Sequence, residues 1–237
     1  MGRRGHRRYA RDAAGRWRRC GDSALAAQPA ILGAPGGRIL VFGFGSPSSG
    51  VPEAWAAQPD RPGINVLPGF DKRSIRRVAE EIGAWRRPGD VVVASIHWGP
   101  NWGYDIPDGH RRFARALIGE IGVDIVHGHS SHHPMAIEIH DGRPVIYGCG
   151  DLINDYEGIG GHESFRPNLT LAWFVDYDRE ARRLRGVEMV PFRLRKFRLE
   201  RLRGEGAAWL AGRLDRECGR FGHGVDLTGD ETLSLSL

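Results

Sequence analysis

Residues 91–134, VVVASIHWGPNWGYDIPDGHRRFARALIGEIGVDIVHGHSSHHP, decide the fold, because two apolar runs flank one amphipathic segment. The first run is predicted to be a strand with His97 at its carboxyl end. In the middle segment, Phe113, Leu117 and Ile121 are spaced four apart, which indicates a helix. The second run, 123–129, is predicted to be another strand. A strand, a helix and a strand in this order indicate a βαβ unit with a parallel sheet.

The second run leads into an unusual group of histidines, with four of the chain's ten within seven positions, 127–133. In open α/β sheets, ligands bind outside the carboxyl ends of the strands. His97 ends one predicted strand, and His129 and His132 follow the next, so we expect these three imidazoles to converge on a metal ion. His127 and His133 are interpreted equally as packing residues or as partners of the ligands.

The segments around this unit predict the rest of an α/β fold. Residues 38–42 are a further buried strand, and the i, i+3, i+4, i+7 spacing at 75–82 predicts an amphipathic helix. Asp141-Gly142 between two alternating runs indicates a hairpin. Residues 169–197 repeat that pattern, and 205–222 predict a short last helix. The expected architecture is a parallel βαβ first half followed by antiparallel hairpins, with a flexible tail at 225–237.

Positive charge is concentrated at the start of the chain. The net charge is +5, but residues 1–20 alone hold eight Arg and one Asp, so the remainder is slightly acidic. This Arg-rich leader is expected to be disordered and dispensable, and a nucleic-acid partner is not expected. A second basic cluster, 193–203, is interpreted first as a strand with a solvated face and second as a phosphate-binding stripe.

Two features bear on the compartment. No apolar run approaches the roughly 18 residues of a membrane span, and the first residues lack the apolar region of a secretory signal. The chain as written is therefore expected to be cytoplasmic. Its three cysteines, Cys20, Cys149 and Cys218, are widely separated and are expected to be reduced thiols.

A group of polar residues follows another predicted strand, in YGCGDLINDYEG, 147–158. Asp151, Asn154 and Asp155 have two interpretations. They terminate the strand in a turn, or one of them orients a ligating histidine or contacts substrate.

Several motifs together resemble the CapA family of poly-γ-glutamate capsule biosynthesis proteins, over Pro29 to Arg179. They are GRILVFGFGSP, SIHWG, HRRFARALI, GHSSHHP and IEIHDGRPVIYGCGDLIND. The resemblance implies a calcineurin-like metallophosphoesterase fold, an α/β sandwich of two sheets with a two-metal site.

The resemblance also implies roles for individual residues. His97 matches the family's lone strand-end histidine, and His129 and His132 match its Gly-His-x-x-His loop, as metal ligands. Arg111, Glu138 and Asp151 fall on recurrent positions and are predicted to form the catalytic group. Asp151 stands where many members carry Asn.

This sequence departs from the family pattern at its start. Members place a Gly-Asp strand end, an acidic motif and an Asn-Asn-His motif before the matching part, and this chain has none of them. It enters the pattern near Gly21. The domain expected over residues 21–224 is therefore partial or N-terminally truncated.

The resemblance implies a metal-dependent hydrolase of phosphoesterase type with an incomplete site. Its cofactor would be a divalent transition metal (Mn, Fe or Zn), with two ions in the complete protein. The substrate would be an anionic small molecule or a cell-envelope polymer. The alternative is a non-catalytic binding or scaffold protein of polymer synthesis or export. Family members can be associated with the envelope.

Overall fold

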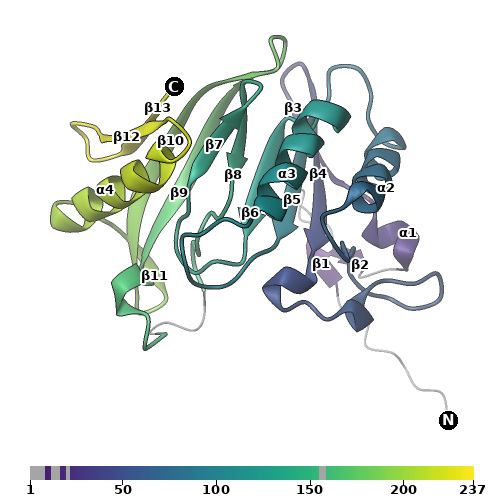
Figure 1. Ribbon diagram of the computed structural model, residues 1–237, viewed down its shortest axis with the longest axis horizontal. Coiled ribbons are helices and arrows are strands. Elements are labelled where there is room, and N and C mark those ends of the chain that lie inside the picture. The colour runs from purple at the N-terminus through teal and green to yellow at the C-terminus, as the bar shows by residue number, and fades with distance from the viewer. Residues whose placement is uncertain (1–8, 12–16, 20–21, 155–158) are drawn as a thin grey trace.

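A computed structural model describes residues 9–11, 17–19, 22–154 and 159–237 of the protein. These residues form a mixed α/β fold with a six-stranded mixed sheet and a separate antiparallel sheet (Figure 1). The arrangement is consistent with the metallophosphoesterase-like α/β fold that the sequence predicts.

The six-stranded sheet contains the predicted parallel unit. Its strands in spatial order are β3 (Ala30–Ala34), β4 (Gly37–Gly45), β5 (Val91–His97), β6 (Ile125–His129), β8 (Arg143–Ile146) and β7 (Ile137–His140). The four central strands run parallel, and the edge strands β3 and β7 are antiparallel to their neighbours. The carboxyl ends of β4, β5 and β6 therefore lie at the same edge of the sheet.

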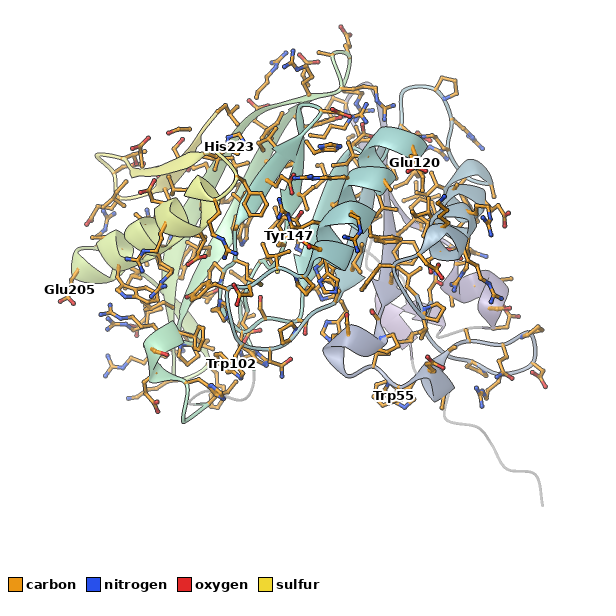
Figure 2. The ribbon with its side chains drawn as sticks, viewed as in Figure 1. Trp55, Trp102, Glu120, Tyr147, Glu205 and His223 are labelled. Atoms are coloured by element: carbon orange, nitrogen blue, oxygen red, sulfur yellow. The ribbon has the colours of Figure 1, made fainter. Side chains whose placement is uncertain are left out.

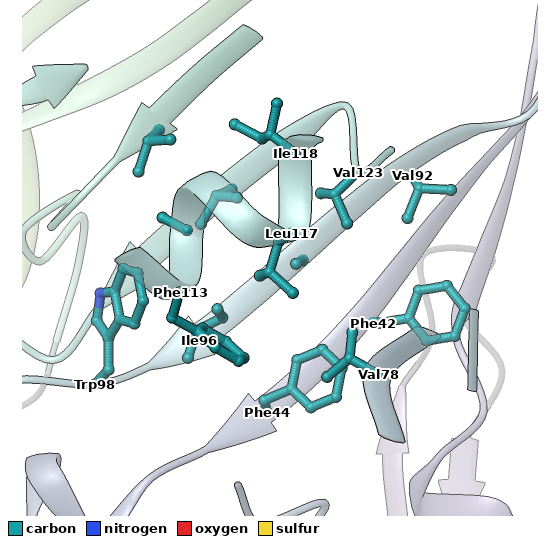
Figure 3. Packing of buried hydrophobic residues seen from close by; sticks show 14 of the residues in the cluster. Phe42, Phe44, Val78, Val92, Ile96, Trp98, Phe113, Leu117, Ile118 and Val123 are labelled. Carbon is teal, nitrogen blue, oxygen red and sulfur yellow. The ribbon is translucent and has the colours of Figure 1, made fainter. Parts of the chain in front are cut away.

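Two helical segments cover one face of this sheet, and we call this side the helix face. They are α2 (Lys72–Gly83) and α3 (Asp108–Ala116), the latter continued by a π turn, η3 (Leu117–Ile121). The core between sheet and helices is apolar: Phe42, Ile96, Phe113 and Leu117 are at most 1% exposed (Figure 3). Because the apolar stripe of each helix needs a partner surface, this packing fixes which way the strands face.

The remaining strands form the second sheet. They are β9 (Leu169–Asp178), β10 (Arg183–Arg195), β11 (Arg198–Arg201), β12 (Gly224–Leu227) and β13 (Leu233–Ser236). Helix α4 (Glu205–Gly219) packs on this sheet through Leu210, Leu214 and Cys218, which are at most 1% exposed. The second sheet therefore has an apolar core of its own.

The shorter elements connect these layers. They are α1 (Ser23–Ala26), η1 (Pro47–Ser49), η2 (Glu53–Trp55) and η4 (Glu163–Phe165). The predicted hairpin is confirmed between β7 and β8. Asp141 and Gly142 both have positive φ, 47° and 72°, as a tight turn between twisted strands requires.

Two predictions about the C-terminal region are wrong. The segment 225–237 is not a flexible tail, because β13 pairs with both β12 and β10 and buries Leu233 and Leu235 in the second core. Residues 193–203 are not one strand. Lys196 and Phe197 adopt positive φ, 49° and 56°, and turn the chain from β10 into the antiparallel β11.

The leader predicted over residues 1–20 lies mostly outside the described residues, as do Cys20 and Asp155. Its described parts, β1 (Tyr9–Arg11) and β2 (Trp17–Arg19), pair in an antiparallel manner. Among the helices that the structure describes, none combines the length and apolar character needed to cross a membrane.

Candidate metal centre

The face of the six-stranded sheet opposite the helices carries polar side chains at its carboxyl edge. Strands alternate their side chains between faces, so Ser95 and His97 of β5 lie on the same side as His127 and His129 of β6. The register places Ser95 beside His127 and His97 beside His129. We call this set of four residues the histidine face.

The two histidines at the strand ends are in direct contact. His97 Nδ1 lies 3.1 Å from His129 Nδ1, and one row back Ser95 Oγ lies 3.1 Å from His127 Nδ1. A cavity of about 380 Å³ adjoins them, with Gly45, Asn65, Ser95, His97 and His129 among its lining residues. The pair is therefore accessible to a small ligand.

Gly128 allows β6 to lie close to Trp98, which follows β5, and to Tyr147, which follows β8. A Cβ atom at this position would lie 2.3 Å from the Tyr147 carbonyl oxygen and 2.4 Å from Trp98 Nε1. Trp98 Nε1 donates to that same carbonyl oxygen at 2.9 Å. Any side chain at 128 would therefore displace the loop that follows His97.

Burial keeps the histidine pair neutral. The pKa of His97 is lowered by burial and secondarily by the charge of His132. The pKa of His129 is lowered to about 4 by burial, with smaller contributions from His127 and His97. At neutral pH both rings therefore keep a lone pair, which is the form that binds metal ions.

His132 lies in the loop after β6 and contacts a different group. Its Nδ1 lies 2.8 Å from Asp151 Oδ2, which also accepts from Asn154 Nδ2 at 2.7 Å. The loop is held by His132 N donating to the Asn101 carbonyl at 3.0 Å. Contact with a carboxylate is the arrangement expected for a histidine whose orientation is fixed by its neighbour.

The structure places Glu138 and Arg111 elsewhere. Glu138 on β7 is 4% exposed on the helix face, where it accepts from Tyr147 Oη at 2.5 Å and pairs with Arg115 at 2.6 Å. Arg111 on α3 lies over the Phe221 ring, 5.0 Å from its centroid. These two members of the predicted catalytic group are therefore not brought to the histidine pair, because the strand register points position 138 to the other face.

The sequence analysis missed two residues of the site, Ser95 and Asn65, and left the role of His133 open. Ser95 was not singled out, although the alternation of VVVASIH puts it on the same side as His97. Asn65 lines the cavity from a loop that gives no chemical signal. His133 is fully buried beside Tyr104 and Phe165, with ring centroids 4.5 and 4.7 Å away, and is a packing residue.

The histidine pair fits part of a metal site. Two nitrogens about 2.1 Å from one ion lie about 3.0–3.4 Å apart when they are neighbouring ligands, and the observed separation is 3.1 Å. Across the residues that the structure describes, however, no group of three or more His, Cys, Asp or Glu side chains is arranged to hold an ion. The pair could supply two nitrogen donors to a metal ion, and further donors would have to complete the set.

Comparison with known proteins decides the family. The pattern of the bacterial capsule synthesis protein family PGA_cap matches residues 19–156, more than half of the chain. The chain belongs to this family. The match includes β3 to β8 with the histidine face, whereas β9 to β13 lie outside it. It agrees with the resemblance that the motifs carry.

Curated relatives agree with this membership. The chain is 44% identical over 199 residues to the probable polyglutamine synthesis accessory protein of Mycobacterium tuberculosis, in strains CDC 1551 and H37Rv, covering 84% of this chain and 52% of the relative. It is 32% identical over 117 residues to the PGA biosynthesis protein CapA of Bacillus subtilis, covering 49% and 28%. This PGA_cap chain spans about half the length of its mycobacterial relatives.

Proposed function

We propose that this protein acts in the synthesis of a capsule polymer of the polyglutamate type, and that its histidine face is part of a metal-dependent hydrolytic centre. The names of the relatives support the first statement. The contact of His97 with His129 at the carboxyl edge of a parallel sheet supports the second. The substrate would be an anionic small molecule or the envelope polymer itself.

In this proposal His97 and His129 hold one divalent transition-metal ion, Mn, Fe or Zn, through their Nδ1 atoms. A bound ion would act as a Lewis acid and lower the pKa of a water molecule. The chain's own residues supply a neutral imidazole pair, a cavity beside it, and a loop that Asp151 stiffens through His132. Without carboxylates in the pair, the ion would be held weakly.

One observation favours the alternative, a non-catalytic binding or scaffold protein. The described residues do not assemble a third ligand beside the pair, and two-metal hydrolysis requires bridging groups that hold both ions. A chain with this partial site would keep the fold and the cavity but turn over little substrate.

Metal content and turnover test the proposal together. After equilibration with Mn²⁺, Fe²⁺ or Zn²⁺, elemental analysis should find one weakly held ion, lost in His97→Ala and in His129→Ala. His140→Ala is the matched control, since His140 lies on β7 away from the pair. Metal-dependent hydrolysis of an aryl phosphate that is lost in both variants would support the enzyme. Metal binding without turnover would support the scaffold protein. Full metal content in both pair variants would contradict the proposal.

A further inference from the structure

A basic groove lies on the second sheet, outside the histidine face. Two cavities of about 400 and 560 Å³ adjoin each other and share Arg166, Asn168 and Arg193. The charged side chains that line the combined groove are Arg166, Arg193, Arg195, Arg203, Glu163 and Glu205. Figure 2 shows Glu205 at the outer end of α4, on the second-sheet side of the molecule.

Half of the groove's arginines are already paired. Arg166 lies 3.6 Å from Glu205 and over the Trp209 ring, 4.8 Å from its centroid, and Arg203 lies 3.2 Å from Glu231. Arg193 and Arg195 differ: within the described part of the chain, neither makes an ion pair or a side-chain hydrogen bond, and both are exposed. The groove therefore keeps two guanidinium groups that the described residues do not hold in an ion pair.

The strand pairing sets one like and one opposite charge against these two arginines. Arg195 lies directly opposite Arg198 of β11, where like charges destabilise a sheet, whereas Arg193 lies opposite Glu200. At the other end of the same long strand, Arg185 donates through Nε to Asp178 at 3.1 Å. The excess of positive charge is therefore greatest around Arg195 and Arg198, and an excess of positive charge favours anions.

The shape of the groove favours a chain over a single small anion. Arg193 and Arg195 point to the same side of β10, because one residue separates them, and lie about 6.7 Å apart along the strand. Consecutive carboxylates of an extended γ-linked glutamate chain, one on every unit and separated by five backbone bonds, have a similar spacing. Guanidinium groups bind carboxylates in a bidentate manner. Among the described residues that line the groove, none has an aromatic side chain on which a nucleic-acid base would stack.

We propose that this groove binds an extended acidic chain with a carboxylate on each unit, of the polyglutamate kind, through Arg193 and Arg195. The inference rests on the proposed function for the choice of polymer, but not on the metal centre. It assigns the second sheet a role in holding the polymer, while the chemistry of the histidine face is separate.

Fluorescence anisotropy with labelled poly-γ-glutamate of one fixed length, added to the full chain, tests the proposal. Arg193→Gln combined with Arg195→Gln should weaken binding by about tenfold or more, since two charge-assisted contacts are lost. The matched control is Arg73→Gln with Arg76→Gln, which removes the same charge from exposed positions on α2. The control should stay within about twofold of the parent chain. Residues 1–20 are the same in all proteins compared, and thermal melting confirms that each is folded.

Several outcomes would contradict the proposal that this groove binds the polymer. They are an equal loss in the control, equally tight binding of neutral polyglutamine, and tighter binding of a single-stranded oligonucleotide of matched length. Inorganic phosphate that displaces the polymer at low concentration would show a simple anion site and would also overturn it. Metal content is measured separately on the same proteins. Retained polymer binding in a parent chain that binds no metal would contradict the metal centre alone.

Discussion

The two faces of the six-stranded sheet are built from the same strands but do different things. On β5, Val92, Ala94 and Ile96 are fully buried under the helices, whereas the alternate positions Ser95 and His97 are half-buried beside a cavity. Because side chains alternate along a strand, the same strand places apolar side chains in the core and polar side chains beside the cavity. Substitutions one position apart should therefore affect unfolding on one face and ligand binding on the other.

The largest effect is expected on the helix face. Phe42→Ala should lower the free energy of unfolding by about 3–5 kcal/mol, because it leaves a cavity where Phe42 is 1% exposed. Ser95→Ala on the histidine face should cost less than about 1 kcal/mol. Urea unfolding of both variants measures the difference. Similar losses would show that the two faces do not divide the roles in this way.

The histidine on the helix face, His110, should make the free energy of unfolding depend on pH. His110 on α3 is 6% exposed and stacks on Trp98, and burial lowers its pKa to about 4. The unfolded chain takes up this proton near pH 6.5, before the folded chain does. The contribution of His110 is thus present above pH 6.5 and lost as the pH falls toward 4, by up to about 3 kcal/mol.

His110→Phe keeps the aromatic packing and removes the titrating group. The free energy of unfolding should depend less steeply on pH between 6.5 and 4 in this variant than in the parent chain. Denaturant unfolding at several pH values gives both slopes. An unchanged slope would mean that His110 is not the buried neutral ring described above.

A substitution in the loop beside the histidine face should lower the affinity for a metal ion. Asp151→Asn removes the carboxylate that contacts His132 Nδ1 at 2.8 Å. Loss of the partner of a ligand typically weakens metal binding by about 10–100-fold, and we expect the lower end, about tenfold, because His132 is not one of the two proposed ligands. Calorimetric titration with Zn²⁺ measures the change, and Asp141→Asn, beside His140, is the control. Equal affinities in the two variants would remove His132 and Asp151 from the site.

A smaller effect is expected where the second sheet joins the first. Tyr177 Oη donates to Asp124 Oδ1 at 2.6 Å, and Asp124 is 1% exposed. Tyr177→Phe should cost about 1–2 kcal/mol, since the buried carboxylate loses one partner but keeps Arg182. Thermal unfolding measures it. A loss as large as that of Phe42→Ala would show that this bond holds the sheets together.

The regular elements were predictable because their periodicity is local. The apolar runs of β5 and β6, the stripe of α2 and the Asp141-Gly142 turn each carry their signal within a few residues. The pairing of His97 with His129 was predictable only as a convergence of strand ends. That both rings meet through Nδ1 depends on strand register, which no local pattern specifies.

The remaining errors have a common cause in tertiary contacts. Residues 225–237 were expected to form a tail, because the alternation at Leu233 and Leu235 is short. The strand β12 is a nearby partner, but the other partner strand, β10, lies far away in the sequence. The resemblance predicts a catalytic role for Glu138, which stays a prediction, and the contacts of its side chain with Arg115 and Tyr147 were not predictable from the sequence. Burial and partners, which decide such cases, are properties of the folded chain.

The central claim is that one divalent ion is shared by the Nδ1 atoms of His97 and His129. Long-range ¹H–¹⁵N correlation spectra of histidine-labelled protein, recorded during a Zn²⁺ titration, test it atom by atom. The account predicts that the Nδ1 signals of these two residues shift together and follow one common binding curve for one ion per chain, while the signals of His140 stay in place. Shifts at Nε2 instead, shifts of only one of the pair, or no shift at any Zn²⁺ concentration would contradict it.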